Sequence, residues 1–287
     1  MTAVALGLGA ALCWGVGDVL ARLASRAIGA YRALLYAQLV GVGMLTAYAG
    51  TTGELARAVG GASPTAWGWA VGTGAIFTVA TFAFYRAMET GVLALVSPIT
   101  ASYAAVTVLL AVAAGETLTT TRTAGIAAAL AGVVVASIPA RAAHEPTGPA
   151  GHAVRWALVA AVAFGVTFWL LGFRVTPAFG GVAAVWVLRA VAALVLLAAS
   201  RPARASLAPP RGPTARLVLA IGALDTLGFV ANNVGTTHGL VSVVSVLGSL
   251  FSAVTVLVAW GTLGERLAVR QWLGVAVLLV GVVLVSR

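Results

Sequence analysis

The chain has 287 residues, of which 61% are hydrophobic and 8% are charged, whereas roughly a quarter of the residues in a soluble globular domain are charged. A soluble domain cannot keep this much apolar surface away from water, so the composition predicts an all-α integral membrane protein. The formal net charge of +10 comes from arginines grouped between apolar runs, which is typical of loops at a lipid headgroup surface and not of a nucleic-acid-binding face.

Long apolar runs recur along the chain, and crossing a bilayer takes about 20 helical residues. Segments rich in Arg, Pro, Gly and Ser separate the runs, which are far longer than the strands of a membrane barrel. We therefore predict ten membrane-spanning helices. In chain order they are residues 3–21, 33–49, 66–85, 92–114, 123–140, 153–173, 181–199, 215–235, 239–262 and 270–285.

The first run has no basic segment before it and no clear cleavage site, so we expect a retained span and not a cleaved signal peptide. Cys13 is the single cysteine, which excludes an intrachain disulfide and a cysteine-based metal site. The chain has no lysine and no phosphate-binding loop motif. We expect no metal, no cofactor and no catalytic residues.

The second half of the chain repeats the first. The peptide AVTVL begins at Ala105 and again at Ala253, and a Gly-Glu pair follows each copy. Upstream, TGAIFT (73–78) aligns with IGALDT (221–226), and WGVG (14–17) aligns with FGVT (164–167). A register held this far indicates a duplicated unit.

Five predicted spans in each unit place the start of the second copy on the opposite side of the membrane from the first. The sequence therefore predicts two inverted five-helix repeats, an architecture common among secondary transporters. Their boundaries are residues 1–140 and 153–287, with a short polar linker at 141–152.

With the repeat established, three motifs carry a family resemblance. LCWGVGD lies in the first span, and GETLTTTRTAGIAAALAGVVV and GERLAVRQWLGVAVLLVGVVL end the two halves. Together they resemble the EamA-type branch of the drug/metabolite transporter superfamily over nearly the whole chain. The resemblance implies ten helices, a central cavity between the halves and export or exchange of small metabolites. Asp18, where the family more often has an uncharged residue, and Gln38, in place of an arginine whose counterpart here is Arg189, depart from the pattern.

A charge inside a membrane span is costly, so it faces a cavity or a partner. Asp18 follows Trp14 by four residues on one helix face, where a carboxylate beside an aromatic wall can hold an amine or exchange a proton. The alternative is that Asp18 pairs with Arg22, one turn on. Arg189 either binds a substrate carboxylate or neutralises Asp225 or Asp18.

The predicted span at 215–235, with the two threonines that follow it, carries a polar side on an otherwise apolar helix. We expect this side to face inward, where it contacts a ligand or bonds to neighbouring helices. Its members form two adjacent stripes: Asp225, Asn232 and Thr236, and Thr226, Asn233 and Thr237.

The remaining polar candidates are assigned by position. Glu116 and Glu265, each at a tight turn, are expected to have helix-end roles. Asp18 and Asp225 are the proton-coupling candidates. The predicted substrate-binding set is Trp14, Asp18, Gln38, Tyr85, Ser97, Trp186, Arg189, Asp225, Asn232 and Asn233.

The sequence gives conflicting indications of membrane orientation. Twelve arginines follow odd-numbered spans and four follow even-numbered spans, which favours both termini outside. The family resemblance implies both termini in the cytoplasm.

The leading hypothesis is a secondary active transporter, an exporter or exchanger of a small polar or amphipathic metabolite, in the cell (inner) membrane. Its expected partners are a small-molecule substrate, the lipid bilayer and a coupled proton, and the expected assembly is a monomer or homodimer. The alternatives are a helix-bundle scaffold, a lipid-modifying enzyme and a passive channel.

Overall fold

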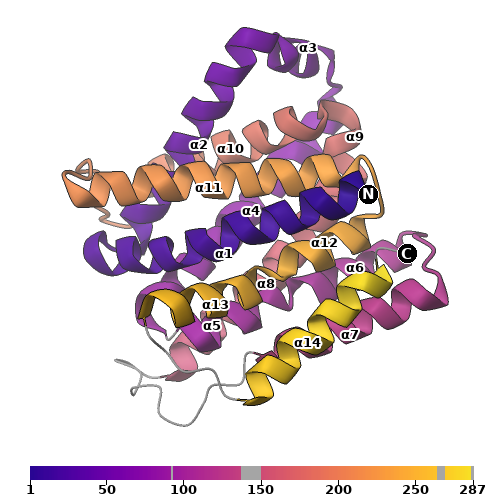
Figure 1. Ribbon diagram of the computed structural model, residues 1–287. Helices are drawn as coiled ribbons and strands as arrows, with labels where there is room; N and C mark the ends of the chain where they lie inside the picture. The colour runs from indigo at the N-terminus through magenta and orange to yellow at the C-terminus, as the bar shows by residue number, and fades with distance from the viewer. Residues whose placement is uncertain (92, 137–149, 264–268, 286–287) are drawn as a thin grey trace.

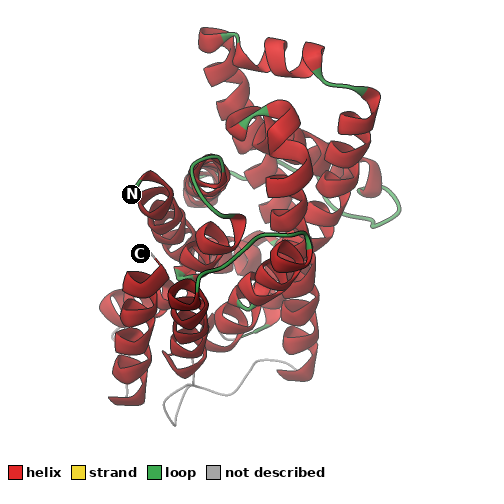
Figure 2. Cartoon of the chain, turned by 90° about the vertical axis from the view of Figure 1, so that its right-hand side faces the viewer, coloured by secondary structure: helices red, strands yellow, loops and turns green. Residues whose placement is uncertain are grey.

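The computed structural model describes residues 1–287 except 92, 137–149, 264–268 and 286–287 (Figure 1). Its regular elements are helices, and no strand occurs among the residues described (Figure 2). The helices are α1 (Thr2–Ile28), α2 (Ala30–Thr52), α3 (Glu54–Gly61), α4 (Pro64–Thr90), α5 (Leu93–Ala101), α6 (Tyr103–Ala113), α7 (Thr120–Ala136), α8 (Ala150–Leu170), the π-helical turn η1 (Leu171–Val175), α9 (Thr176–Phe179), α10 (Gly181–Ala199), α11 (Pro213–Thr236), α12 (Val241–Ser249), α13 (Phe251–Leu263) and α14 (Val269–Val285).

Seven helical segments of the described chain are long and apolar enough to cross a membrane. Shorter apolar helices occupy Thr120–Val135, Val241–Thr255 and Trp272–Val285. The prediction of an all-α, multi-pass membrane protein is therefore confirmed, while the arrangement of ten spans in two repeats stays a prediction. The predicted linker at 141–152 lies largely outside the described residues.

Two of the predicted spans are broken in the middle. The span at 92–114 divides at Ser102 into α5 and α6, and the span at 239–262 divides at Leu250 into α12 and α13. At both residues ψ is close to zero, −5° at Ser102 and −8° at Leu250, which interrupts the regular helical hydrogen bonding. The breaks lie at aligned positions of the two halves.

The segment after α2 also differs from the expectation of a loop, because Glu54–Gly61 forms α3. Gly53 ends α2 with a left-handed φ of 64°, and the carboxylate of Glu54 lies in the first turn of α3, where the helix dipole favours a negative charge.

The main helix contacts join the two halves of the chain. Helix α1 packs against α11 and α13, α4 packs against α8, and α7 packs against α14. Figure 1 shows α1 beside α11 and α7 beside α14. The first residue of α1 and the last of α14 lie near each other at the same end of the molecule in both views (Figures 1 and 2).

Glycines let several of these helices approach closely, and the contacts recur in the two halves. A Cβ atom on Gly15 of α1 would lie 2.5 Å from the Cβ of Val254 on α13, and one on Gly165 of α8 would lie 2.5 Å from the Cβ of Val106 on α6. Beside each contact a threonine hydroxyl donates to the glycine carbonyl, Thr255 to Gly15 at 3.2 Å and Thr107 to Gly165 at 3.1 Å. Both crossings therefore depend on the missing side chain.

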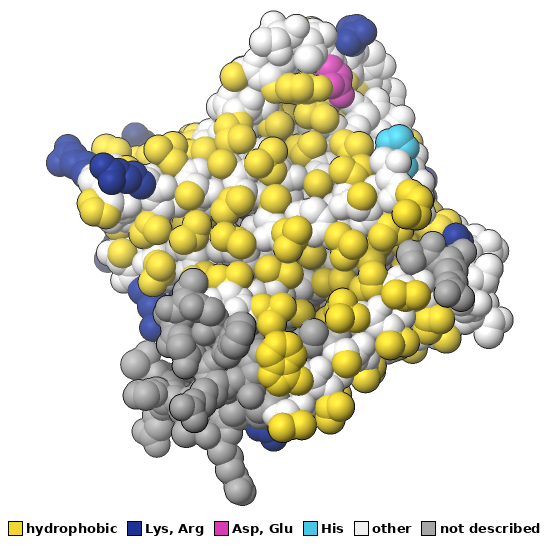
Figure 3. Space-filling model, viewed as in Figure 1, with side chains coloured by type: hydrophobic (Ala, Val, Ile, Leu, Met, Phe, Trp, Pro, Cys, Tyr) yellow, Lys and Arg dark blue, Asp and Glu magenta, His cyan; other side chains and the backbone are white. Residues whose placement is uncertain are grey.

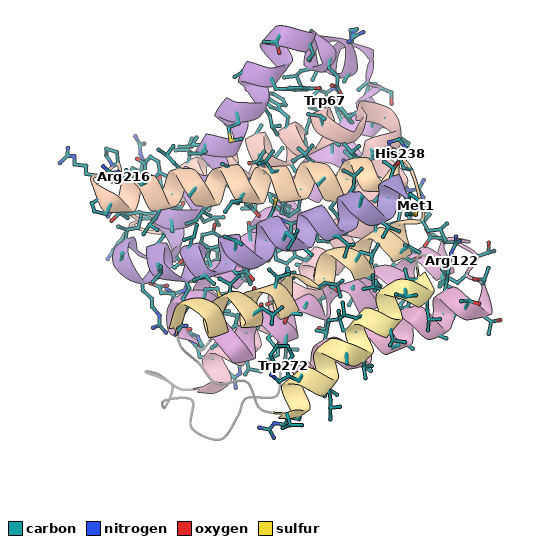
Figure 4. All side chains as sticks on the ribbon, viewed as in Figure 1. Met1, Trp67, Arg122, Arg216, His238 and Trp272 are labelled. Carbon is teal, nitrogen blue, oxygen red and sulfur yellow. The ribbon has the colours of Figure 1, made fainter. Side chains whose placement is uncertain are left out.

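The face of the molecule shown in Figure 3 is largely apolar. Hydrophobic side chains extend over α1, α11 and α14 in the face shown in Figure 3, with arginines at the end where α11 begins. Figure 4 places Arg216 at that end and Met1, Arg122 and His238 toward the opposite end. Exposed leucines such as Leu109 and Leu12, 72% and 59% exposed, suit contact with lipid chains.

We expect Gly165→Ala to destabilise the bundle, because the added methyl group would collide with Val106 and with the carbonyl oxygen of Tyr103, 2.9 Å away. The cost of such overpacking is about 1–3 kcal/mol. Thermal unfolding of the purified protein in detergent measures the effect. The matched control is Gly72→Ala on α4, where a Cβ meets open space; equal melting temperatures for the two variants would contradict the packing described here.

Candidate functional site

A cavity lies at the centre of the helix bundle, between the two halves of the chain. The empty space within it, including the part that is open to solvent, is about 580 Å³. Its walls come from α1, α4, α5, α6, α8, α11 and α13. Two carboxylates, Asp18 and Asp225, line it. The aromatic side chains in its wall are Trp14, Phe84, Tyr85, Tyr103, Phe164, Phe168, Phe229 and Phe251.

These aromatic rings contact one another and form a continuous wall. Trp14 contacts both Phe229 and Phe168, with centroid distances of 5.1 and 5.6 Å, and Phe168 stacks on Phe229 at 5.4 Å. Tyr103 reaches Phe168 at 4.7 Å. The wall therefore presents ring faces and edges from both halves to the same space.

Asp18 is 6% exposed and accepts weak hydrogen bonds from two hydroxyl groups. Ser97 Oγ lies 3.4 Å and Thr255 Oγ1 lies 3.3 Å from Asp18 Oδ2. Thr255 has a shorter alternative acceptor in the carbonyl of Phe251, at 2.8 Å. The structure shows the ion pairs Arg86–Glu89 and Arg189–Asp225, and the pairing of Asp18 with Arg22 stays a prediction.

Arg189 of α10 is fully buried and serves as the counterion of Asp225 on α11. Its Nη2 donates to Asp225 Oδ2 at 2.8 Å, and its Nη1 donates to Gln38 Oε1 on α2 at 3.0 Å. The guanidinium carbon lies 5.4 Å from the centre of the Phe229 ring. The structure therefore shows Arg189 paired with Asp225, which is one of the roles that the sequence analysis considered for it.

Gly41 on α2 makes room for this arginine. A Cβ atom there would lie 2.7 Å from Arg189 Cδ and 2.5 Å from the hydroxyl of Thr226. The arginine side chain is thus enclosed by α2, α10 and α11, and it does not line the cavity.

Four residues of the predicted substrate-binding set line the cavity together: Trp14, Asp18, Tyr85 and Asp225. Ser97 contacts the cavity indirectly, through its hydrogen bond to Asp18. Gln38 and Arg189 lie behind Asp225.

The other predicted residues have packing partners elsewhere or lie outside the cavity wall. Trp186 Nε1 donates to Thr46 Oγ1 at 2.9 Å. Asn233 Nδ2 donates to the Gly181 carbonyl at 2.7 Å, and its Oδ1 accepts from Thr176 at 2.8 Å, so Asn233 fixes α11 to the start of α10. Asn232 is 1% exposed and does not line the cavity; its Oδ1 has no hydrogen-bond partner among the described residues.

The phenylalanines of the cavity wall escaped the sequence analysis, although the internal repeat contained the signal. In the aligned halves Phe164 occupies the position of Trp14, Phe168 that of Asp18, and Phe251 that of Tyr103. Both members of each pair line the cavity. The residues of the second half that align with Trp14 and Asp18 are Phe164 and Phe168, so the alignment alone could have predicted two of these rings.

Glu116 has the helix-end role predicted for it. Its two carboxylate oxygens accept from the backbone N–H groups of Val241 and Ser242 at 2.6 and 3.1 Å, which caps the start of α12. Glu265 lies outside the described residues.

The sequence model of the EamA-like transporter family matches residues 1–138 and again residues 152–287. The chain belongs to the EamA-like transporter family. The resemblance drawn from its motifs is thereby confirmed, and membership in a transporter family goes with the multi-pass helical fold.

The fold has a counterpart among solved structures, and no curated protein matches the sequence. A crystal structure titled only "Crystal structure of protein" superposes with a TM-score of 0.78. The match covers 98% of this chain and 95% of the other at 19% sequence identity, so it shows a shared fold.

We expect Asp225→Leu to destabilise the protein strongly, because it leaves a fully buried guanidinium with Gln38 as its remaining hydrogen-bond partner among the described residues. Removing one partner of a buried pair costs about 3–5 kcal/mol. Thermal unfolding in detergent should show a large loss for Asp225→Leu. The double variant Arg189→Met/Asp225→Leu should recover much of it, and additive losses would contradict the pairing.

Proposed function

We propose that this protein is a secondary active transporter in the cell (inner) membrane. It exports or exchanges a small polar or amphipathic molecule through the central cavity by alternating access. The observation that carries the proposal is a cavity with an incompletely bonded carboxylate, Asp18, between the two segments that match a transporter family. Trp14, Tyr85 and Asp225 complete the proposed binding site.

The proposed architecture is ten spans in two inverted repeats, residues 1–140 and 153–287, joined by the linker 141–152. Exchanged contacts support it. Gly132 packs on Leu278, and Gly281 packs on Ala129. In the aligned halves Gly132 corresponds to Gly281 and Ala129 corresponds to Leu278, so each half makes the same contact with the other. Such reciprocal contacts are what a two-fold relation between copies produces.

We infer alternating access from the position of the cavity between the two halves of the chain. Its walls come from both repeats, so a small rotation of one repeat against the other opens it toward one side and closes it toward the other. A gradient or a counter-substrate supplies the driving force, because the chain has no nucleotide-binding motif.

Proton coupling is the second part of the proposal, with Asp18 as the first candidate and Asp225 as the second. Among the described residues that line the cavity, the titratable groups besides Asp18 are Asp225, Tyr85 and Tyr103, while Arg189 lies behind Asp225 and Arg22 lies one turn along α1. Tyrosines ordinarily ionise at about pH 10, so we assign the coupled proton to a carboxylate and not to Tyr85 or Tyr103. Because Asp225 is neutralised by Arg189, Asp18 is the better proton acceptor.

Family membership favours transport over the scaffold and lipid-modifying alternatives, and we propose that the chain is not an enzyme and acts as a monomer or homodimer. Saturable counterflow would separate it from a passive channel.

Coupling is measurable in vesicles before the substrate has been identified. In proteoliposomes with an acidic interior, a compound that exchanges for protons raises the fluorescence of an acridine pH-gradient dye. A panel of amino acids, amines and drugs should contain compounds that do so with the wild-type protein. We expect Asp18→Asn to abolish this response, because the amide can neither take up nor release a proton.

The matched control is Glu54→Gln, which neutralises a carboxylate on α3, remote from the cavity lining, and should leave the response intact. Unchanged responses in both Asp18→Asn and Asp225→Asn would overturn the coupling. Transport itself would remain testable by counterflow at equal pH.

A further inference from the structure

We propose that the cavity selects organic monocations, with the positive nitrogen at Asp18 and an apolar or aromatic body against the ring wall. This inference rests on the proposed transport function and names its substrate class.

The first argument is the incomplete solvation of Asp18. A buried carboxylate ordinarily accepts several short hydrogen bonds or pairs with a cation. Asp18 has two hydroxyl contacts of 3.3 and 3.4 Å, and one of those hydroxyls has a closer acceptor. The geometry leaves space beside Asp18 for a cation, and the described residues that line the cavity include no cationic side chain.

The second argument is the charge balance around the cavity. Two carboxylates line it, and one buried guanidinium pairs with Asp225, which leaves Asp18 as the carboxylate without a counterion among the described lining residues. No arginine occurs among the described lining residues, and the two terminal nitrogens of Arg189 are engaged with Asp225 and Gln38. An anionic ligand would meet this negative charge with no cation free to pair with it, whereas a monocation balances it.

The third argument is the character of the wall. Trp14 lies on the same helix face as Asp18, and Phe84, Tyr85 and Phe168 line the same space. Ring faces attract cations held within about 6 Å, and quaternary ammonium groups are recognised in this way.

The duplicated halves differ at the position that carries the charge. The position of Asp18 is occupied in the second half by Phe168, and both side chains line the cavity. One copy therefore supplies an anion and the other supplies a ring. This arrangement suits a ligand with one charged end and one apolar end.

Binding to the full-length protein in detergent tests the proposal with three probes of similar size and different charge. They are benzyltrimethylammonium, benzyl alcohol and benzenesulfonate, titrated calorimetrically at one pH and one ionic strength. The quaternary cation cannot lose its charge. We expect it to bind at least about tenfold more tightly than the alcohol, and the sulfonate to show no binding.

Asp18→Asn should lower the affinity for benzyltrimethylammonium by about tenfold or more, while Thr255→Val, which keeps the charge, should lower it by less than about threefold. Phe168→Leu removes a ring and keeps an apolar wall. It should lower the affinity for benzyltrimethylammonium more than the affinity for benzyl alcohol. If Asp18→Asn does not fold, the proposal is tested by the relative affinities of the wild-type protein for the three probes and by the Phe168→Leu variant. Equal affinity for the three probes, tighter sulfonate binding, or no binding of any probe overturns the proposal.

Counterflow of labelled benzyltrimethylammonium in proteoliposomes separates this inference from the transport function. Asp18-dependent binding without counterflow would refute transport and leave the ligand class standing. A vesicle response limited to anionic or zwitterionic compounds would refute the ligand class and leave transport standing.

Discussion

A fully buried arginine sets the electrostatics of this protein. In a helix bundle surrounded by lipid, the guanidinium of Arg189 is shielded from bulk water, so it must be held by polar groups of the protein. Asp225 and Gln38 meet that requirement, and the glycine at position 41 leaves the space for the side chain. Once this pair is formed, Asp225 has a counterion, whereas Asp18 has none among the described residues that line the cavity.

Close backbone contact brings the surrounding helices into place. Without a hydrophobic effect between helices in lipid, packing and interhelical hydrogen bonds must hold the bundle. Gly15 and Gly165 permit two such crossings, and in each a threonine hydroxyl bonds to the glycine carbonyl. These crossings join helices from different halves of the chain, so the contacts that hold the halves together also shape the central cavity.

The duplication explains both the regularity of the scaffold and the asymmetry of the site. Contacts between backbones recur at aligned positions, whereas the cavity-lining side chains have diverged, as the exchange of Asp18 for Phe168 shows. Gln38 and Arg189, the aligned residues of α2 and α10, contact each other directly. A chain with a repeated sequence can therefore bring unlike side chains, here a carboxylate and an aromatic ring, to one cavity.

The sequence alone determined the membrane class, the helical fold, the internal repeat and the family, because hydropathy, helix length and motif spacing are local properties. It also predicted Trp14, Asp18, Tyr85 and Asp225, which the structure brings to one cavity. Helical periodicity indicates which side of a helix is polar, but not which neighbour that side meets. Only the tertiary structure decided that Arg189 pairs with Asp225, that Asn233 holds α10, and that phenylalanines from α8, α11 and α13 complete the wall, since these contacts depend on distances between helices far apart in the chain.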